Sequence, residues 1–158
     1  MNEAQRVKGR LGRIFKRKGR DGRYTRLFEN LNPLQREALL KETPPDPEEL
    51  PVIGSAEGQE KWMLITTKRI VWRLNSKTQS LPLEAIWDVV ADFPKLVTTG
   101  LKKDEMKELQ ILTADGRRYS FEVEKGAPLS GVWNALKNVG HRNRGLAQSE
   151  PSSESRRT

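Results

Sequence analysis

The chain has 158 residues and contains no cysteine, a single histidine and no long apolar run. Without cysteine there is no disulfide, thiolate nucleophile or zinc–thiolate site, so nothing in the composition points to an oxidising compartment. A membrane-spanning helix needs about 18 or more consecutive apolar residues, and no such run is present. The first residues also lack the apolar segment of a secretory signal. We therefore expect a cytoplasmic protein.

Catalytic groups are equally scarce. His141 follows Gly140 at the end of a predicted helix, with no carboxylate or nucleophile beside it in the sequence. Asp88 and Asp92, and the acids between residues 104 and 108, are typical of solvated strand ends and loops and lack the glycine spacing of a calcium loop. A nucleophile–base pair cannot be assembled from these residues. We expect no enzyme activity, metal ion, cofactor or small-molecule substrate.

What the chain does have is a basic N-terminus. Residues 1–30 carry ten Lys or Arg against three acids, whereas residues 31–50 carry two against five. A cluster of this kind is an electrostatic footprint for an anionic partner. The candidate anionic-surface residues are Arg6, Lys8, Arg10, Arg13, Lys16, Arg17, Lys18, Arg20, Arg23 and Arg26.

The same segment has an apolar stripe. Val7, Leu11, Ile14 and Phe15 fall within an arc of about 100° when plotted at helical spacing. Such a helix could insert this stripe into an anionic bilayer, which makes these four residues a candidate membrane-insertion face. Two glycines inside the stripe oppose a helix at roughly 1 kcal/mol each. We expect residues 1–26 to be a disordered or inducibly helical arm.

Three roles remain open for this arm. It is either a solvated tail, a peripheral attachment to an anionic membrane, or a segment that contacts the phosphates of nucleic acid.

The next segment, residues 27–49, is better specified. Asn32 is placed to cap a helix, Pro33 suits the first helical position and Gln35 completes a capping box. This helix should end near Glu42, ahead of a proline-rich connector.

From about Leu50 the apolar residues alternate, which predicts antiparallel strands with one buried face. Two hairpins are clearest. One runs from Trp62 to Leu74, and the other from Glu108 to Val123 with Asp115 and Gly116 in its turn. Pro82 predicts an edge strand or bend. Residues 95–107 are interpreted as a loop, with a short strand at 96–98.

The last predicted element is a helix that begins at Pro128 and carries Leu129, Val132, Trp133 and Leu136 on one face. Gly140 is placed to end it. Residues 143–158 have too little apolar content to fold, so we expect a disordered tail.

The segments LITTKRIVW (Leu64–Trp72), LPLEAIWDV (Leu81–Val89) and ILTADGRRYSFEV (Ile111–Val123), with Trp133 in the last helix, resemble the pleckstrin-homology-like (PH-like) family, especially its bacterial and GRAM-like members. The resemblance covers roughly residues 50–142. It implies a mainly β fold, a bent barrel of about six or seven antiparallel strands in two orthogonal sheets. A C-terminal helix would cap this barrel, and an N-terminal helical extension would precede it.

The resemblance also implies a non-enzymatic binding module. Members that bind phosphoinositides carry bases in the loop between the first two strands, whereas residues 54–60 here hold two acids and no base. We therefore expect an unidentified protein partner at the barrel, with peripheral attachment to an anionic lipid surface through the arm. The alternative is a nucleic-acid-associated protein that uses the same arm.

Overall fold

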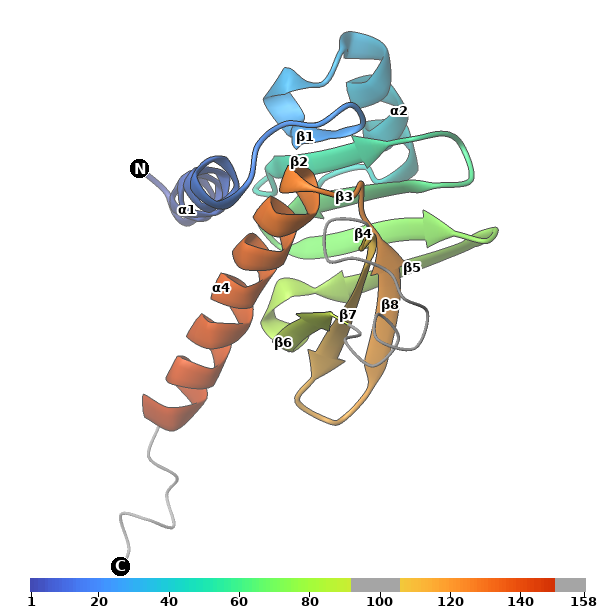
Figure 1. Ribbon diagram of the computed structural model, residues 1–158. Helices are drawn as coiled ribbons and strands as arrows, with labels where there is room; N and C mark the ends of the chain where they lie inside the picture. The colour runs from blue at the N-terminus through green and yellow to red at the C-terminus, as the bar shows by residue number, and fades with distance from the viewer. Residues whose placement is uncertain (92–105, 150–158) are drawn as a thin grey trace, which may run out of the picture.

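The computed structural model describes residues 1–91 and 106–149, which form two antiparallel sheets and three α-helices (Figure 1). In chain order the elements are α1 (Glu3–Lys18), β1 (Thr25–Leu27), η1 (Phe28–Asn30), α2 (Pro33–Glu42), β2 (Pro51–Ala56), β3 (Trp62–Thr66), β4 (Arg69–Leu74), β5 (Lys77–Pro82), η2 (Leu83–Ala85), β6 (Ile86–Ala91), β7 (Glu108–Thr113), β8 (Arg118–Glu122) and α4 (Ala127–Ser149).

The first sheet has the strand order β1-β2-β3-β4-β5, and both of its faces are covered near β3. Met63 and Ile65 point into the main core, while Trp62 and Leu64 pack in a second, smaller cluster under η1 and α2. The sequence predicted only one buried face for this hairpin. The second face is buried because α2 folds back over β2 and β3 instead of standing apart from the sheet.

The second sheet has the order β6-β7-β8, and α4 packs on β6. The predicted hairpin is confirmed, since β7 and β8 pair antiparallel around a turn in which Gly116 has a φ of +88°. Glu122 on β8 contacts Lys61, which follows β2, so a charged contact joins the two sheets. The predicted edge position of Pro82 is also confirmed, because β5 lies at the edge of the first sheet.

The fold prediction is confirmed in its coarse form only. The described residues hold two antiparallel sheets followed by a C-terminal helix, as expected, but the sheets do not close into a barrel and together contain eight strands. The additional strand is β1, which pairs with β2 at Thr25–Ser55 and Leu27–Ile53. The sheet therefore begins at residue 25, within the segment that the sequence assigned to the arm.

The prediction for residues 1–26, a disordered or inducibly helical arm, differs most from the structure because the helix there packs on the fold. Residues 3–18 form α1, and its four apolar residues belong to the main core. The predicted boundary at residue 50 consequently does not divide two packed bodies. The helix of segment 27–49 is confirmed, with Asn32 and Gln35 forming the predicted capping box.

The C-terminal helix is longer than predicted. α4 continues past Gly140 to Ser149, so residues 143–149 are helical and not a tail. A Cβ at Gly140 would lie 2.8 Å from the Trp87 carbonyl oxygen, which shows that the glycine permits close packing on β6. Gly140 therefore allows α4 to lie close to β6, and it does not end the helix. The predicted loop and short strand at 95–105, and tail residues 150–158, lie outside the described residues.

Candidate functional site

α1 is well specified at both ends. The Asn2 side chain accepts a hydrogen bond from the Gln5 amide at 2.8 Å, and the Gln5 side chain accepts one from the Asn2 amide. Glu3 lies in the first turn and three bases lie in the last, which is the favourable arrangement for the helix dipole. These end effects support the helix against the cost of its two internal glycines.

Packing against α4 fixes α1 in place (Figure 1). Leu11 and Phe15 are fully buried. Phe15 lies so close to Gly131 of α4 that a Cβ there would be 2.6 Å from the ring. At the ends of the contact, Ser130 Oγ donates to the Lys18 carbonyl at 2.7 Å and Arg10 Nε donates to Asn138 Oδ1 at 3.1 Å.

One carboxylate fastens the chain where it leaves α1. Glu124 accepts hydrogen bonds from the backbone amides of Arg23, Tyr24 and Thr25 at 2.7–2.8 Å. These three hydrogen bonds hold β1 beside β2 and restrict the linker that joins β1 to α1. The sequence carries no signal for this contact, because Glu124 is separated from its partners by about 100 residues.

The four residues of the predicted membrane-insertion face do not lie on the surface of this fold. Val7, Leu11, Ile14 and Phe15 are all at least nine-tenths buried in the main core. Exposing four such side chains would cost roughly 6–12 kcal/mol at 1.5–3 kcal/mol each. That is comparable to the whole stability of a domain, about 5–15 kcal/mol. Insertion would also uncover the apolar surface of α4 and β2 on which α1 packs, so it requires the core to open.

The outward face of α1 is cationic. We define the cationic surface as Lys8, Arg13, Lys16 and Arg17, none of which forms an ion pair with a described carboxylate. The first three line a groove of about 470 Å³ between α1 and the segments that contain β1, η1 and β2, whose wall also includes Leu27, Glu29 and Val52. Unpaired cations beside a groove can attract an anion without first breaking an internal contact.

The remaining predicted cations are engaged to different degrees. Arg6 pairs with Glu3, and Arg26 donates to backbone carbonyls of Gly22 and Asn30. Arg23 lies 5.1 Å from the centre of the Tyr24 ring. Lys18 and Arg20 are exposed at the end of α1. The structure thus brings together only part of the predicted set on one surface.

Arg10 connects the cationic surface to α4. Burial and the nearby Arg142 guanidinium lower the pKa of Arg10. Burial is the larger cause, and the positive charge of Arg142 adds to it. Arg142 lies on the part of α4 that the sequence did not predict, because this helix was expected to end before it.

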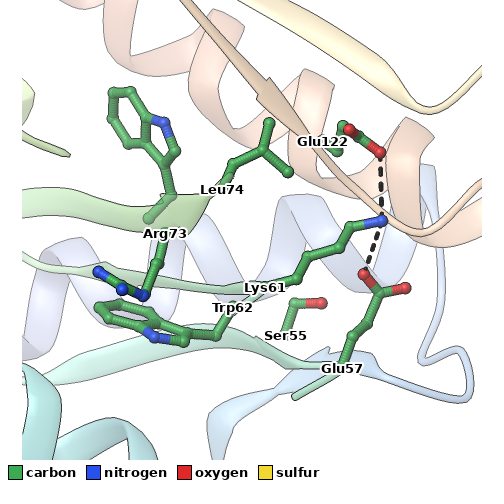
Figure 2. A pocket seen from close by; sticks show the side chains of 8 residues that line it. Ser55, Glu57, Lys61, Trp62, Arg73, Leu74 and Glu122 are labelled. Atoms are coloured by element: carbon green, nitrogen blue, oxygen red, sulfur yellow. Dashed lines mark hydrogen bonds and ion pairs between the residues drawn. The ribbon is translucent and has the colours of Figure 1, made fainter. Parts of the chain in front are cut away.

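A second polar cluster lies between the two sheets (Figure 2). Lys61 Nζ lies 2.9 Å from Glu57 Oε2 and 3.1 Å from Glu122 Oε1. Burial alone would lower the pKa of Lys61, but the hydrogen bonds that Lys61 donates to both carboxylates, together with their negative charges, outweigh it and raise the pKa. The cavity beside them measures about 10 Å³, room for about one water. We interpret this cluster as a structural clamp between the sheets.

The other candidates for chemistry are occupied or exposed. Asp88 lies 3.6 Å from Lys137 and 3.7 Å from Arg144, and His141 is exposed on α4. Asp92 and acids 104–105 lie outside the described residues. Within residues 1–91 and 106–149, no group of three or more acidic or histidine side chains is arranged to hold a metal ion. The helices of the same ranges include none with the length and hydropathy of a membrane span.

No protein-family model matches this chain, and no curated protein shows significant sequence similarity to it.

Proposed function

We propose that the protein is a non-enzymatic binding module that holds the phosphate backbone of a nucleic acid on the cationic surface of α1. The observation that carries the proposal is the combination of a buried apolar stripe with unpaired cations on the opposite side of the same helix. Burial removes the apolar contribution on which a membrane-bound amphipathic helix depends. Electrostatic attraction to phosphates needs no such contribution.

The non-enzymatic part of the proposal is supported by how the polar candidates are used. Lys61 is held between two carboxylates, and Asp88 faces two cations. The cavity beside Lys61 has room for only about one water, and Ser55 in its lining accepts a hydrogen bond from the Thr25 hydroxyl. These groups stabilise the fold, and we assign no reaction to them.

The test compares two triple variants with the same change in net charge. Arg13→Gln/Lys16→Gln/Arg17→Gln removes three residues of the cationic surface, while Lys68→Gln/Lys77→Gln/Lys125→Gln removes three exposed lysines elsewhere. Binding to a labelled duplex DNA of mixed sequence is measured by fluorescence anisotropy at several salt concentrations. Each lost phosphate contact lowers the slope of log K against log salt by about 0.9, so the first variant should lose about 2–3 in slope.

The control variant should keep the wild-type slope. Equal losses in both variants would show that only net charge matters and would overturn the proposal. The anionic membrane remains an outcome of the same experiment. Vesicles of phosphatidylcholine with and without phosphatidylserine are titrated at matched ionic strength, and stronger binding to the anionic vesicles than to DNA would also overturn it.

We also propose that residues 51–149 are a diverged PH-like domain. In support, seven antiparallel strands in two sheets precede a helix, and Trp133 Nε1 in that helix donates to the Val89 carbonyl at 2.9 Å. An experimental structure tests this. If the domain is PH-like, its strand order and helix position should superimpose on those of a PH domain. A different connectivity of the strands would contradict the proposal.

A further inference from the structure

A groove of about 780 Å³ lies between α2, the β2–β3 connection and β4, away from the cationic surface. Its volume falls within the range of about 300–1,000 Å³ typical of ligand sites. The apolar part of its lining comes from Leu34, Ala38, Leu39, Ala56 and Trp62. We propose that this groove binds a short peptide segment of a partner protein that carries both apolar and basic side chains.

The first argument is that α2 leaves an apolar face uncovered. Of its ten residues only Leu39 is buried, and Leu34 is 77% exposed. Ala38 lies one turn further along the same side and is also exposed. Residues separated by four positions share a helix face, so Leu34 and Ala38 offer a continuous apolar strip beside the groove.

The second argument is an unpaired donor in the groove wall. Trp62 is only 5% exposed, and its indole Nε1 has no hydrogen-bond partner among the described residues. A buried donor left without an acceptor is unfavourable. A carbonyl oxygen of an incoming peptide backbone would supply the acceptor. The site therefore contains a group whose energy improves when a ligand arrives.

An exposed ion pair lies beside Trp62 in the lining of the groove. Arg73 stands directly opposite Trp62 on the neighbouring strand, and both side chains line the groove. Arg73 pairs with Glu60 at 3.0 Å, but the Glu60 side chain is 64% exposed. Exposed ion pairs contribute little to stability. This pair can therefore rearrange when a peptide enters.

The third argument is charge. The groove is lined by three acids, Glu42, Glu57 and Glu60, against two bases, Lys41 and Arg73, so its lining is negative by one charge. Glu42 is the last residue of α2, where the helix dipole is already negative, and it forms no ion pair with a described residue. Glu42 and Glu60 both line the groove. A basic side chain is favoured at this end, and a polyanion is disfavoured, which separates this site from the cationic surface.

The probe is a short peptide of alternating leucine and lysine, titrated into ¹⁵N-labelled protein. Two matched peptides replace lysine by glutamate or leucine by serine. The indole N–H resonance of Trp62 should move downfield only with the first peptide, because a new hydrogen bond deshields that proton. Its affinity should exceed that of the matched peptides by about tenfold, equivalent to about 1.4 kcal/mol.

Two variants make the result specific. Leu34→Ser should weaken binding of the leucine–lysine peptide, whereas Leu146→Ser, which changes a similarly exposed leucine on α4, should not. Trp62→Phe removes the indole donor and should weaken binding of the same peptide, and its melting temperature measures the separate cost of the smaller ring in the second cluster. An unshifted indole resonance, or equal binding of the lysine and glutamate peptides, would overturn the proposal.

Discussion

α1 and α2 are both short, capped helices on the surface of one fold, yet they are held in opposite ways. α1 buries four apolar side chains against α4 and the sheets, while α2 buries only Leu39. The local sequence signals favour α2 over α1 as a helix, because α2 has proline at its first position and α1 contains two glycines. Tertiary burial, and not intrinsic propensity, decides how firmly each helix is held.

The largest expected effect on stability comes from a substitution in the contact between α1 and α4. Phe15→Ala removes a fully buried ring from the α1–α4 contact and should cost about 3–5 kcal/mol of unfolding free energy. Leu34→Ala on α2 should change it by less than about 0.5 kcal/mol, because that side chain is exposed. Urea denaturation measures both values. Similar losses in the two variants would remove the distinction.

The linker of α1 gives an intermediate effect. Glu124→Ala deletes the carboxylate that accepts three backbone amides, and hydrogen bonds to charged groups contribute about 1.5–3 kcal/mol. We expect a loss of about 2–3 kcal/mol together with faster amide exchange at Tyr24 and Thr25. Lys125→Ala, at the neighbouring exposed position, is the control and should leave both unchanged. An equally stable Glu124→Ala protein would show that packing alone holds the linker.

Replacing each of two glycines by alanine should change the stability of the protein in opposite directions. Gly131→Ala places a methyl group 2.6 Å from the Phe15 ring and should destabilise by about 1–3 kcal/mol. Gly12→Ala places one 3.8 Å from Leu27, an ordinary contact, and should stabilise α1 by about 1 kcal/mol. Melting temperatures of the two variants report both signs, and a destabilising Gly12→Ala would contradict the described position of α1.

Much of the fold could be predicted from the sequence wherever the signal was local. The capping box at Asn32 and the hairpin around Gly116 depend on neighbouring residues and were predicted correctly. The packed position of α1 was not predicted, because it depends on contacts with α4, which lies far away in the sequence. The continuation of α4 past Gly140 was not predicted either, because a glycine can end a helix or permit close packing, and only the Trp87 carbonyl beside it distinguishes the two.

The candidate site divides in the same way. The cations of residues 6–26 were identified from composition, but which of them are unpaired follows from the fold. Arg142 and the Trp62 indole could not be predicted, since one needs the full length of α4 and the other needs the position of α2 over the sheet. The charged residues can be identified from the sequence, whereas burial depends on how the helices and sheets pack together.

The most direct test of the account is native-state hydrogen exchange of the amides in α1. If α1 is a core element, the amides of residues 11–15 should exchange only through global unfolding, with protection that matches the free energy from denaturation. The amides of α2 should exchange through smaller local openings. Exchange of residues 11–15 within seconds, as in an unprotected arm, would contradict the central claim.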